Sequence, residues 1–228
     1  MKIIVLTGAG ISAESGIPTF RDKNGLWEGH DVMEVASPQG WDANPELVLN
    51  FYNERRKNAL NAKPNLGHKL LASLEQEHDV TIITQNVDNL HERAGSSKVI
   101  HLHGELFKVR STAFESLIYD LKGWKLSLGD LCEKGYQLRP HIVWFGEMVP
   151  MMETAIDICA TAEILVIVGT SLLVYPAASL IHYVNPAIPI FVIDPKIPDL
   201  PSNLNIACIQ EIGSKGLIQF KNILTEKY

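Results

Sequence analysis

The sequence predicts an α/β protein in which a doubly wound parallel sheet carries a smaller lobe built from two insertions. Near-continuous apolar runs recur along the chain with helical patterns between them, an alternation typical of a parallel sheet covered on both faces. The first run, Lys2–Thr7, leads directly into a glycine-rich turn. Two stretches, 23–62 and 107–140, break the alternation because they lack a strong strand pattern. We expect them to pack together as the smaller lobe, with a ligand cleft between that lobe and the carboxyl edge of the sheet.

The remaining elements follow from pattern and length. Further apolar runs predict strands over 80–84, 99–102, 142–145, 164–168 and 188–193. Amphipathic stretches predict helices over 45–60, 65–78, 152–162, 176–184 and 214–225. With 228 residues, 46% of them hydrophobic, the chain can bury one domain core together with a smaller insert. We therefore assign residues 1–22, 63–106 and 141–228 to the main domain and residues 23–62 and 107–140 to the small lobe.

The composition argues against several kinds of partner. The formal net charge is -6 and the basic residues are dispersed except at Arg55-Arg56-Lys57, so we expect no nucleic-acid binding. The first strand follows Met1 directly and no apolar run reaches the roughly 18 residues of a membrane span, so we expect neither a signal peptide nor a membrane segment. Cys132, Cys159 and Cys208 are far apart and form no C-x-x-C. We expect a cytoplasmic protein whose cysteines are reduced and mostly buried.

The glycine-rich turn after the first strand is the first candidate site. Gly8, Gly10 and Ala13 satisfy the G-x-G-x-x-G/A spacing of dinucleotide-binding turns. In that pattern one glycine makes the tight turn, the next lets backbone N–H groups reach a pyrophosphate, and the small residue allows close helix packing. Glycine pairs also close turns that bind nothing, so the spacing alone leaves both interpretations open.

The second strong strand ends in amide and carboxylate side chains, at Gln85-Asn86-Val87-Asp88. A hydride-transferring dinucleotide enzyme places an acid about 20 residues after the glycines, where it holds the ribose hydroxyls. Here the next strong strand ends much farther along the chain, which weakens the hydride-transfer interpretation. His91-Glu92 does not begin an H-E-x-x-H zinc motif, because Gly95 occupies the position of the second histidine.

Two histidines, His101 and His103, lie two residues apart and would share one face of a strand. A metal pair lacks a third ligand at a helpful spacing, and zinc needs three or four. His103 stands at a strand end beside Gly104, and an ordinary histidine pKa near 6.5 suits proton transfer at neutral pH. We predict that His103 is a general base and that His101 is a structural histidine of the strand.

Taken in order, these motifs resemble those of the sirtuins. The resemblance rests on the run 8–21, on Gln85-Asn86-x-Asp88 with Leu90-His91, and on His103-Gly104, Phe145-Gly146-Glu147 and Gly169-Thr170-Ser171. It covers nearly the whole chain and is of the bacterial, CobB-like kind. It implies NAD-dependent removal of acyl groups from the lysines of proteins or peptides, on a Rossmann-like NAD-binding domain with a smaller lobe.

The resemblance also implies which residues bind NAD. The set would be Gly8, Ala9, Gly10, Ser12, Ala13, Thr19, Phe20, Arg21, Trp27, Gln85, Asn86, Val87, Asp88, Gly169, Thr170, Ser171, Asp194, Pro195 and Lys196. Asn86 and Asp88 would hold the nicotinamide ribose and carboxamide, while Phe20 and Arg21 would shield the reactive sugar. At Asp194 the family commonly has an asparagine.

In the mechanism that the family implies, the acyl-lysine carbonyl oxygen attacks the anomeric carbon as nicotinamide leaves. His103 would be the general base, with Asn86 and Asp88 as the other catalytic residues, and the acyl group would pass to ADP-ribose. The products would be free lysine, nicotinamide and O-acyl-ADP-ribose. Two alternatives are mono-ADP-ribosyl transfer to protein and a non-catalytic NAD-responsive binding module.

A further pair of residues bears on the acyl group. Tyr52 and Arg55 are three positions apart on an expected helix and so share a face, a pattern also common in ordinary amphipathic helices. The pair resembles the Tyr-x-x-Arg of the sirtuin subgroup that accepts succinyl and malonyl groups, and Ala36 matches the small residue that widens the acyl pocket there. A guanidinium and a phenol suit a carboxylate chemically.

The stretch in which most sirtuins carry four zinc-binding cysteines holds only Cys132 here, and Ser111 stands where the first ligand would be expected. One thiolate cannot build a tetrahedral site, so we expect no zinc. In its place we expect packing of the apolar side chains of Phe114, Leu117, Ile118, Tyr119, Leu121, Trp124, Leu126, Leu128 and Leu131.

Two loops resemble those that clamp the substrate peptide as an added strand in this family. The residues concerned are Phe145, Gly146, Glu147, Met148 and Val174. Main-chain pairing of this kind gives affinity with little selectivity for peptide sequence. We expect the protein to be a monomer.

Overall fold

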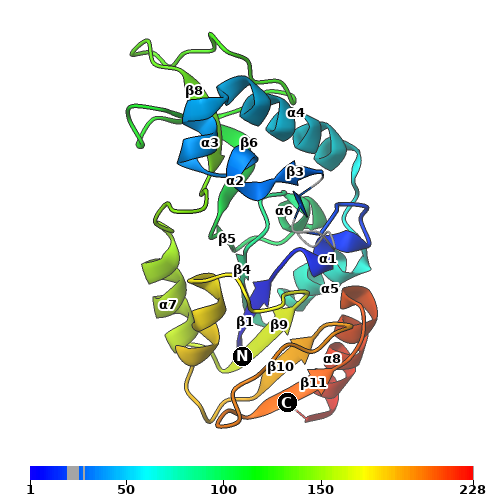
Figure 1. Ribbon diagram of the computed structural model, residues 1–228. Helices are drawn as coiled ribbons and strands as arrows, with labels where there is room; N and C mark the ends of the chain where they lie inside the picture. Colours follow the sequence, from blue (N-terminus) through cyan, green and yellow to red (C-terminus); the bar gives the residue numbers. More distant parts are fainter. Residues whose placement is uncertain (20–25, 28, 228) are drawn as a thin grey trace.

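The computed structural model describes residues 1–19, 26–27 and 29–227 as a large α/β domain with a smaller lobe above it (Figure 1). The large domain holds a six-stranded parallel sheet in the order β11-β10-β9-β1-β4-β5. The strands are β1 (Lys2–Thr7), β4 (Asp79–Thr84), β5 (Val99–His101), β9 (Ile164–Val168), β10 (Ile190–Ile193) and β11 (Ile206–Ile209). This arrangement confirms the predicted doubly wound fold.

Both faces of the sheet are covered because successive side chains of a strand point to opposite sides. Ile3 and Val5 pack toward α5 (Leu66–Leu74) and α8 (Gly213–Lys227), in the core cluster that also holds Phe220. Ile4 and Leu6 pack toward α7 (Met152–Ala160) and the 3-10 helix η1 (Ala177–His182). The shorter helices of this domain are α1 (Gly10–Ala13) and α6 (Leu90–Ala94). No helix of the described residues is long and apolar enough to cross a membrane.

The small lobe combines three helices with antiparallel strands. The helices are α2 (Val32–Val35), α3 (Pro38–Ala43) and α4 (Pro45–Asn61). A two-stranded sheet consists of β2 (Leu26–Trp27) and β3 (His30–Asp31). A three-stranded sheet in the order β7-β6-β8 consists of β7 (Ile118–Asp120), β6 (Gly104–Ser111) and β8 (Leu138–Ile142). Asn44 begins α4 by accepting a hydrogen bond at Oδ1 from the backbone N–H of Leu47, and Pro45 occupies the first helical turn.

Strand β6 links the two parts of the protein. Its pairing with β8 shifts register between Gly104 and Val109, where the chain leaves the sheet domain for the lobe. Within that irregular segment, the N–H of Leu106 donates to the carbonyl of Val87 at 2.7 Å, and the carbonyl of Leu106 accepts from Arg56 Nε at 2.7 Å. The backbone of a single residue, Leu106, therefore ties the loop after β4 to helix α4.

Several details differ from the sequence-based expectations. Residues 142–145 do not form a strand of the parallel sheet, since β8 ends at Ile142 and belongs to the antiparallel sheet of the lobe. The domain boundaries placed at residues 106 and 140 accordingly fall inside β6 and β8. The lobe strands escaped prediction because they carry charged residues, and β8 also holds Pro140, which an edge strand tolerates. Strand β11 was not predicted, and the helix expected over 176–184 is the shorter 3-10 helix η1.

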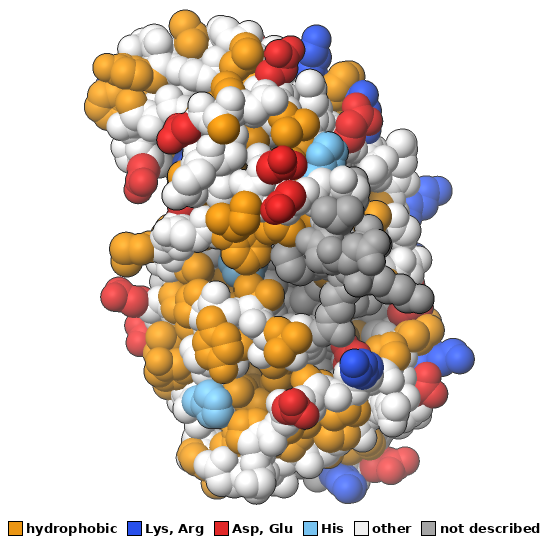
Figure 2. All heavy atoms as spheres, in the orientation of Figure 1, with side chains coloured by type: hydrophobic (Ala, Val, Ile, Leu, Met, Phe, Trp, Pro, Cys, Tyr) orange, Lys and Arg blue, Asp and Glu red, His pale blue; other side chains and the backbone are white. Residues whose placement is uncertain are grey.

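The tip of the small lobe has less apolar packing than was predicted. Of the nine apolar side chains expected to pack there, Phe114, Ile118, Leu128 and Leu131 are exposed, and Figure 2 shows hydrophobic side chains on the surface of the tip. Leu126 is buried and packs with side chains of α4 and β6. Polar contacts contribute more than expected, since the backbone N–H of Leu126 donates to Asn53 Oδ1 and its carbonyl accepts from Asn53 Nδ2, both at 2.9 Å.

Ser111 and Cys132, which lie in the stretch where zinc ligands would be expected from the resemblance, are in contact with each other. The Cys132 thiol donates to Ser111 Oγ at 3.4 Å, and the same oxygen accepts from the backbone N–H groups of Ala113 and Phe114 at 3.3 Å each. Both side chains are buried. Cys159 is also buried, whereas Cys208 is exposed, and all three cysteines are free of disulfides.

Candidate functional site

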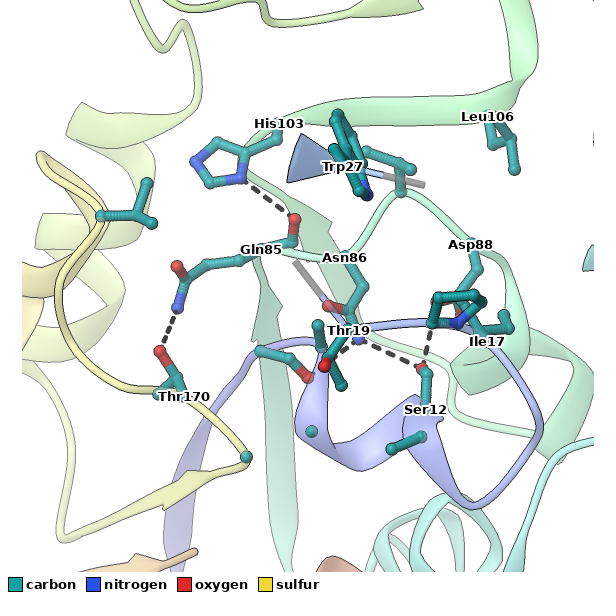
Figure 3. Close-up of a pocket in the computed structure, with 18 of the residues that line it drawn as sticks. Ser12, Ile17, Thr19, Trp27, Gln85, Asn86, Asp88, His103, Leu106 and Thr170 are labelled. Carbon is teal, nitrogen blue, oxygen red and sulfur yellow. Dashed lines mark hydrogen bonds between the residues drawn. The ribbon is translucent and has the colours of Figure 1, made fainter. Parts of the chain in front are cut away.

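A pocket of about 490 Å³ lies between the carboxyl edge of the six-stranded sheet and the small lobe. The sheet contributes the loops that follow β1, β4, β9 and β10, as expected for ligand sites of open parallel sheets. The lobe contributes helix α4, the turn after α2 and the segment that follows β8. Figure 3 shows side chains from both parts turned toward this space.

The glycines of the first loop serve close packing of two backbones. A Cβ on Gly8 would lie 2.7 Å from the carbonyl oxygen of Gly169, and a Cβ on Gly10 would lie 2.6 Å from the Cα of Gly169. The N–H of Gly8 donates to the carbonyl of Val168 at 3.0 Å, and the N–H of Gly10 donates to that of Gly169 at 2.8 Å. The N–H of Gly10 therefore joins the loops after β1 and β9, and the binding of a pyrophosphate by backbone N–H groups of this turn stays a prediction.

Asn86, Asp88 and Ser12 form one hydrogen-bonded group at the bottom of the pocket (Figure 3). Ser12 Oγ donates to Asp88 Oδ2 at 3.0 Å, and Asn86 Nδ2 lies 3.2 Å from Ser12 Oγ and 3.1 Å from the carbonyl of Gly8. Burial raises the pKa of the Asp88 carboxyl, although the hydrogen bonds from the Leu90 N–H and from Ser12 oppose this. The three side chains are thus fixed in position before any ligand binds.

His103 is oriented by the backbone. Its Nδ1 lies 3.0 Å from the carbonyl oxygen of Gln85, which can only accept, so Nδ1 carries the proton and Nε2 keeps a lone pair (Figure 3). Burial lowers the pKa of His103, and the bond to Gln85 only partly offsets this. The side chain of Gln85 is fixed in turn by a 3.0 Å hydrogen bond from Nε2 to Thr170 Oγ1. The arrangement gives a neutral base that lines the pocket.

His101 has the structural role predicted for it. Its Nδ1 lies 2.9 Å from the carbonyl of Asn86, and its Nε2 lies 2.7 Å from Glu92 Oε1. Burial alone would lower the pKa of His101, but the hydrogen bond and charge of Glu92 outweigh it and raise that pKa. His101 therefore holds the backbone of the loop that carries Asn86.

The lobe side of the pocket brings together the residues predicted to contact an acyl group. Tyr52 and Arg55 both line it from α4, and Ala36 lines it from the turn after α2. The Arg55 guanidinium carbon lies 4.1 Å from the centre of the Trp27 ring, so the indole packs on the cation. Trp27, predicted as a contact of NAD, thus lies against Arg55, which was predicted to contact an acyl group.

Two arginines and one carboxylate form an ion-pair cluster next to Trp144. Glu147 Oε1 accepts from Arg139 Nη1 at 2.7 Å and from Arg110 Nη2 at 3.1 Å, and Oε2 accepts from the backbone N–H of Trp144 at 2.8 Å. Burial alone would raise the pKa of Glu147, but the hydrogen bonds from Arg139 and Trp144 and the arginine charges lower it. The carboxylate predicted to contact a peptide is engaged within the protein, although Glu147 still borders the pocket.

The pocket gathers most of the site residues predicted from the sequence. Those among its lining residues are Gly8, Ala9, Gly10, Ser12, Ala13, Thr19, Trp27, Ala36, Tyr52, Arg55, Gln85, Asn86, Val87, Asp88, His103, Phe145, Gly146, Glu147, Gly169, Thr170, Ser171, Val174, Asp194 and Pro195. Lys196 and Met148 do not line it, and both are exposed. Phe20 and Arg21 lie outside the described residues.

Sequence reasoning missed other lining residues. Trp144 immediately precedes the predicted Phe145-Gly146-Glu147 segment and could have been found by extending it. Ile212 and Gly213 follow β11, and they could not be placed at the sheet edge from the sequence because that strand was not predicted. Among the residues that the structure describes, no group of three or more histidine, cysteine, aspartate or glutamate side chains is arranged to hold a metal ion.

Comparison with known proteins agrees with the fold. Residues 8–176 match the model of the Sir2 family. The chain is 56% identical over 212 residues to an NAD-dependent protein deacylase from Helicobacter pylori, covering 92% of this chain and 91% of that protein. The fold and pocket define an α/β protein with its ligand site at the sheet edge, and the chain belongs to the Sir2 family, the sirtuins.

Solved structures of similar proteins extend the match. A Sir2 homologue in complex with NAD superimposes with a TM-score of 0.89 at 38% identity, covering 99% of this chain and 90% of that one. Sir2 bound to an acetylated peptide gives a TM-score of 0.79 at 30% identity, covering 98% of this chain and 92% of that one. The similarity therefore extends over the whole described fold.

Proposed function

We propose that this protein is an NAD-dependent protein-lysine deacylase that removes succinyl, malonyl and acetyl groups. Family membership, the name of the Helicobacter pylori relative and the NAD and acetylated-peptide complexes of similar structures support the general activity. The observation that carries the proposal is that His103, the Asn86–Asp88 group and the Tyr52–Arg55 pair line one pocket. A base, a polar nucleotide subsite and a cationic acyl subsite are thus brought together.

The sheet side of the pocket suits NAD. Its donors and acceptors match the hydroxyls and carboxamide of a nicotinamide riboside. They lie in the loops that follow the strands and, for Ser12, in α1: Ser12, Gln85, Asn86, Asp88 and Thr170. When bound, NAD would supply a ribose carbon that becomes electrophilic as the nicotinamide bond breaks. Asn86 and Asp88 would orient that ribose, and His103 would accept a hydroxyl proton at Nε2. With these roles for Asn86, Asp88 and His103, the products would be free lysine, nicotinamide and O-acyl-ADP-ribose.

The lobe side would select the acyl group. Arg55 is 8% exposed and Tyr52 is fully buried, so a carboxylate that reaches them loses most of its water and depends on their hydrogen bonds. Hydrogen bonds to charged groups contribute about 1.5–3 kcal/mol each, and an arginine can make two of them to one carboxylate. An acetyl group has no carboxylate, so its removal gains nothing from these bonds.

The matched test compares Arg55→Met with Lys57→Met, which removes an exposed cation from the same helix. We expect Arg55→Met to lower kcat/KM for a succinyl-lysine peptide about 100-fold, the equivalent of roughly 3 kcal/mol, and to change deacetylation less than about threefold. Lys57→Met should change neither. Equal loss of both activities in Arg55→Met would refute the acyl assignment.

Product masses distinguish deacylation from its alternatives. The protein is incubated with NAD and matched acetyl- and succinyl-lysine peptides. Acyl-ADP-ribose is the expected product, whereas ADP-ribosylated protein would indicate a transferase, and unchanged NAD would indicate a binding module.

We also propose that the protein functions without zinc. Ser111, expected to stand in place of the first zinc ligand, is hydrogen-bonded to Cys132, and one thiolate provides too few ligands for a tetrahedral site. Elemental analysis should find well under one zinc per chain, and a stoichiometric amount would refute this. The cytoplasmic location, the monomeric state and the lack of nucleic-acid and membrane binding stay predictions.

A further inference from the structure

The hydroxyl of Tyr52 is held by a partner outside α4. Trp144 Nε1 lies 3.1 Å from the Tyr52 hydroxyl oxygen, and both side chains are buried. An indole N–H can only donate, so the phenol oxygen must be the acceptor in this bond. The proton of the Tyr52 hydroxyl is consequently directed away from Trp144 and is available to another acceptor.

Tyr52 also stays protonated at neutral pH. Burial raises the pKa of Tyr52 to about 12, which outweighs the lowering effects of Arg55, Trp144, Arg139 and Arg56. A neutral phenol can donate to a carboxylate, whereas a phenolate would repel it. The pocket wall therefore combines a cation at Arg55 with a neutral donor at Tyr52.

Trp144 is itself firmly positioned. The guanidinium carbon of Arg139 lies 3.2 Å from the centre of its ring, and Glu147 binds both Arg139 and the backbone N–H of Trp144. The ring also packs on Trp41 at a centroid distance of 5.7 Å. The contacts of Arg139 and Glu147 with Trp144 thus give the indole N–H a fixed direction.

We propose that Trp144 is a positioning residue for acyl selectivity, because its indole N–H orients the Tyr52 hydroxyl so that it donates to the carboxylate of a bound acyl chain. Trp144 acts through Tyr52 and takes no part in the chemical steps. This inference rests on the proposed deacylase function and adds the origin of one of its selective hydrogen bonds.

The test is Trp144→Phe, which keeps an aromatic ring for Arg139 and Trp41 and removes the N–H donor. We expect KM for a succinyl-lysine peptide to rise about tenfold with little change in kcat, and deacetylation to change less than about twofold, since one charge-assisted hydrogen bond is weakened. Trp41→Phe is the control, because Trp41 packs on the same ring without touching the hydroxyl, and it should leave the ratio of the two activities unchanged.

A double-mutant cycle with Tyr52→Phe separates positioning from packing. Tyr52→Phe alone should raise the succinyl KM by about tenfold or more, and adding Trp144→Phe should then have no further selective effect. Equal effects of Trp144→Phe on both acyl groups, or additive effects of the two changes, would overturn the inference. If Trp144→Phe does not fold, an unchanged succinyl KM in Tyr52→Phe would overturn it by itself.

Failure of the proposed function would look different. In that case the unmodified protein would not remove succinyl groups, or Arg55→Met would lower both activities equally. If the unmodified protein and Arg55→Met behave as expected and only the Trp144 and Tyr52 results differ, the positioning role of Trp144 alone is wrong.

Discussion

Replacing Glu147 with glutamine should destabilise the protein strongly. The carboxylate accepts hydrogen bonds from Arg139, Arg110 and the backbone of Trp144, and the two guanidiniums have no other carboxylate among the ion pairs of the described residues. Glutamine keeps one acceptor oxygen but loses the charge and turns an N–H group toward a donor. Two cations would then remain mostly buried without a counter-charge.

The magnitude follows from this burial. The side chains of Glu147, Arg139 and Arg110 are 20%, 10% and 11% exposed, so the network is largely shielded from water. Breaking a fully buried pair costs about 3–5 kcal/mol, and the residual exposure places our expectation near the lower end, at about 3 kcal/mol. For a chain of this length that corresponds to a fall in Tm of about 6–12 °C.

The assay is thermal and denaturant unfolding of Glu147→Gln beside Glu54→Gln. Glu54 pairs with Lys57 at 2.6 Å but is 64% exposed, so its loss should cost less than about 0.5 kcal/mol. A destabilisation by Glu147→Gln as small as that of the control would refute the view that this ion pair supports the lobe.

The pH dependence of the stability difference between the unmodified protein and Glu147→Gln is a second check. The folded-state pKa of Glu147 is below its usual value, so its contribution is present at neutral pH and is lost as pH falls through that lowered pKa. The stability gap between the unmodified protein and Glu147→Gln should therefore shrink in acid. A gap that is constant with pH would mean that the charge is not its origin.

Further predictions concern the base, the first loop and the lobe tip. Because burial lowers the pKa of His103, the acid limb of the kcat/KM profile for deacylation should lie below pH 6.5, and His103→Asn should lower the rate at least about 100-fold. Gly10→Ala should destabilise the protein by about 1–3 kcal/mol and weaken NAD binding measured by calorimetry, because its Cβ would collide with Gly169. Ser111→Ala should cost about 1–2 kcal/mol and speed amide hydrogen exchange over 112–138 only, because it removes the acceptor used by Cys132 and two backbone N–H groups. Unchanged exchange there would show that these bonds do not hold the tip.

The central sheet could be predicted because its strands are buried on both faces and so appear as continuous apolar runs. The lobe strands could not, since β6 and β8 place charged residues such as Arg110 and Arg139 beside apolar ones. The burial of both arginines depends on Glu147, which lies outside either strand. Strand β11 is short and two of its four residues are exposed, which left too weak a pattern.

The candidate site divides in the same way. Tyr52 and Arg55 were predictable as neighbours because helical spacing alone puts them on one face. The contacts of Trp144 with Tyr52 and of Trp27 with Arg55 join residues from different elements, and no local pattern reports such contacts. The spacing of the glycines in the first loop could be recognised in the sequence. The reason that these positions need glycine is visible only in three dimensions, because a Cβ there would collide with the loop after β9.

The two backbone hydrogen bonds of Leu106 limit how this protein could be re-engineered. The N–H of Leu106 is bound to the loop that carries Asn86 and Asp88, and its carbonyl is bound to Arg56, the neighbour of Arg55. A change that shifts α4 would strain these two bonds and so disturb the loop that carries Asn86 and Asp88. Variants with new acyl preferences should therefore keep Arg56 and α4 in place and enlarge the pocket from the side of Ala36, whose backbone bonds to Phe145 instead.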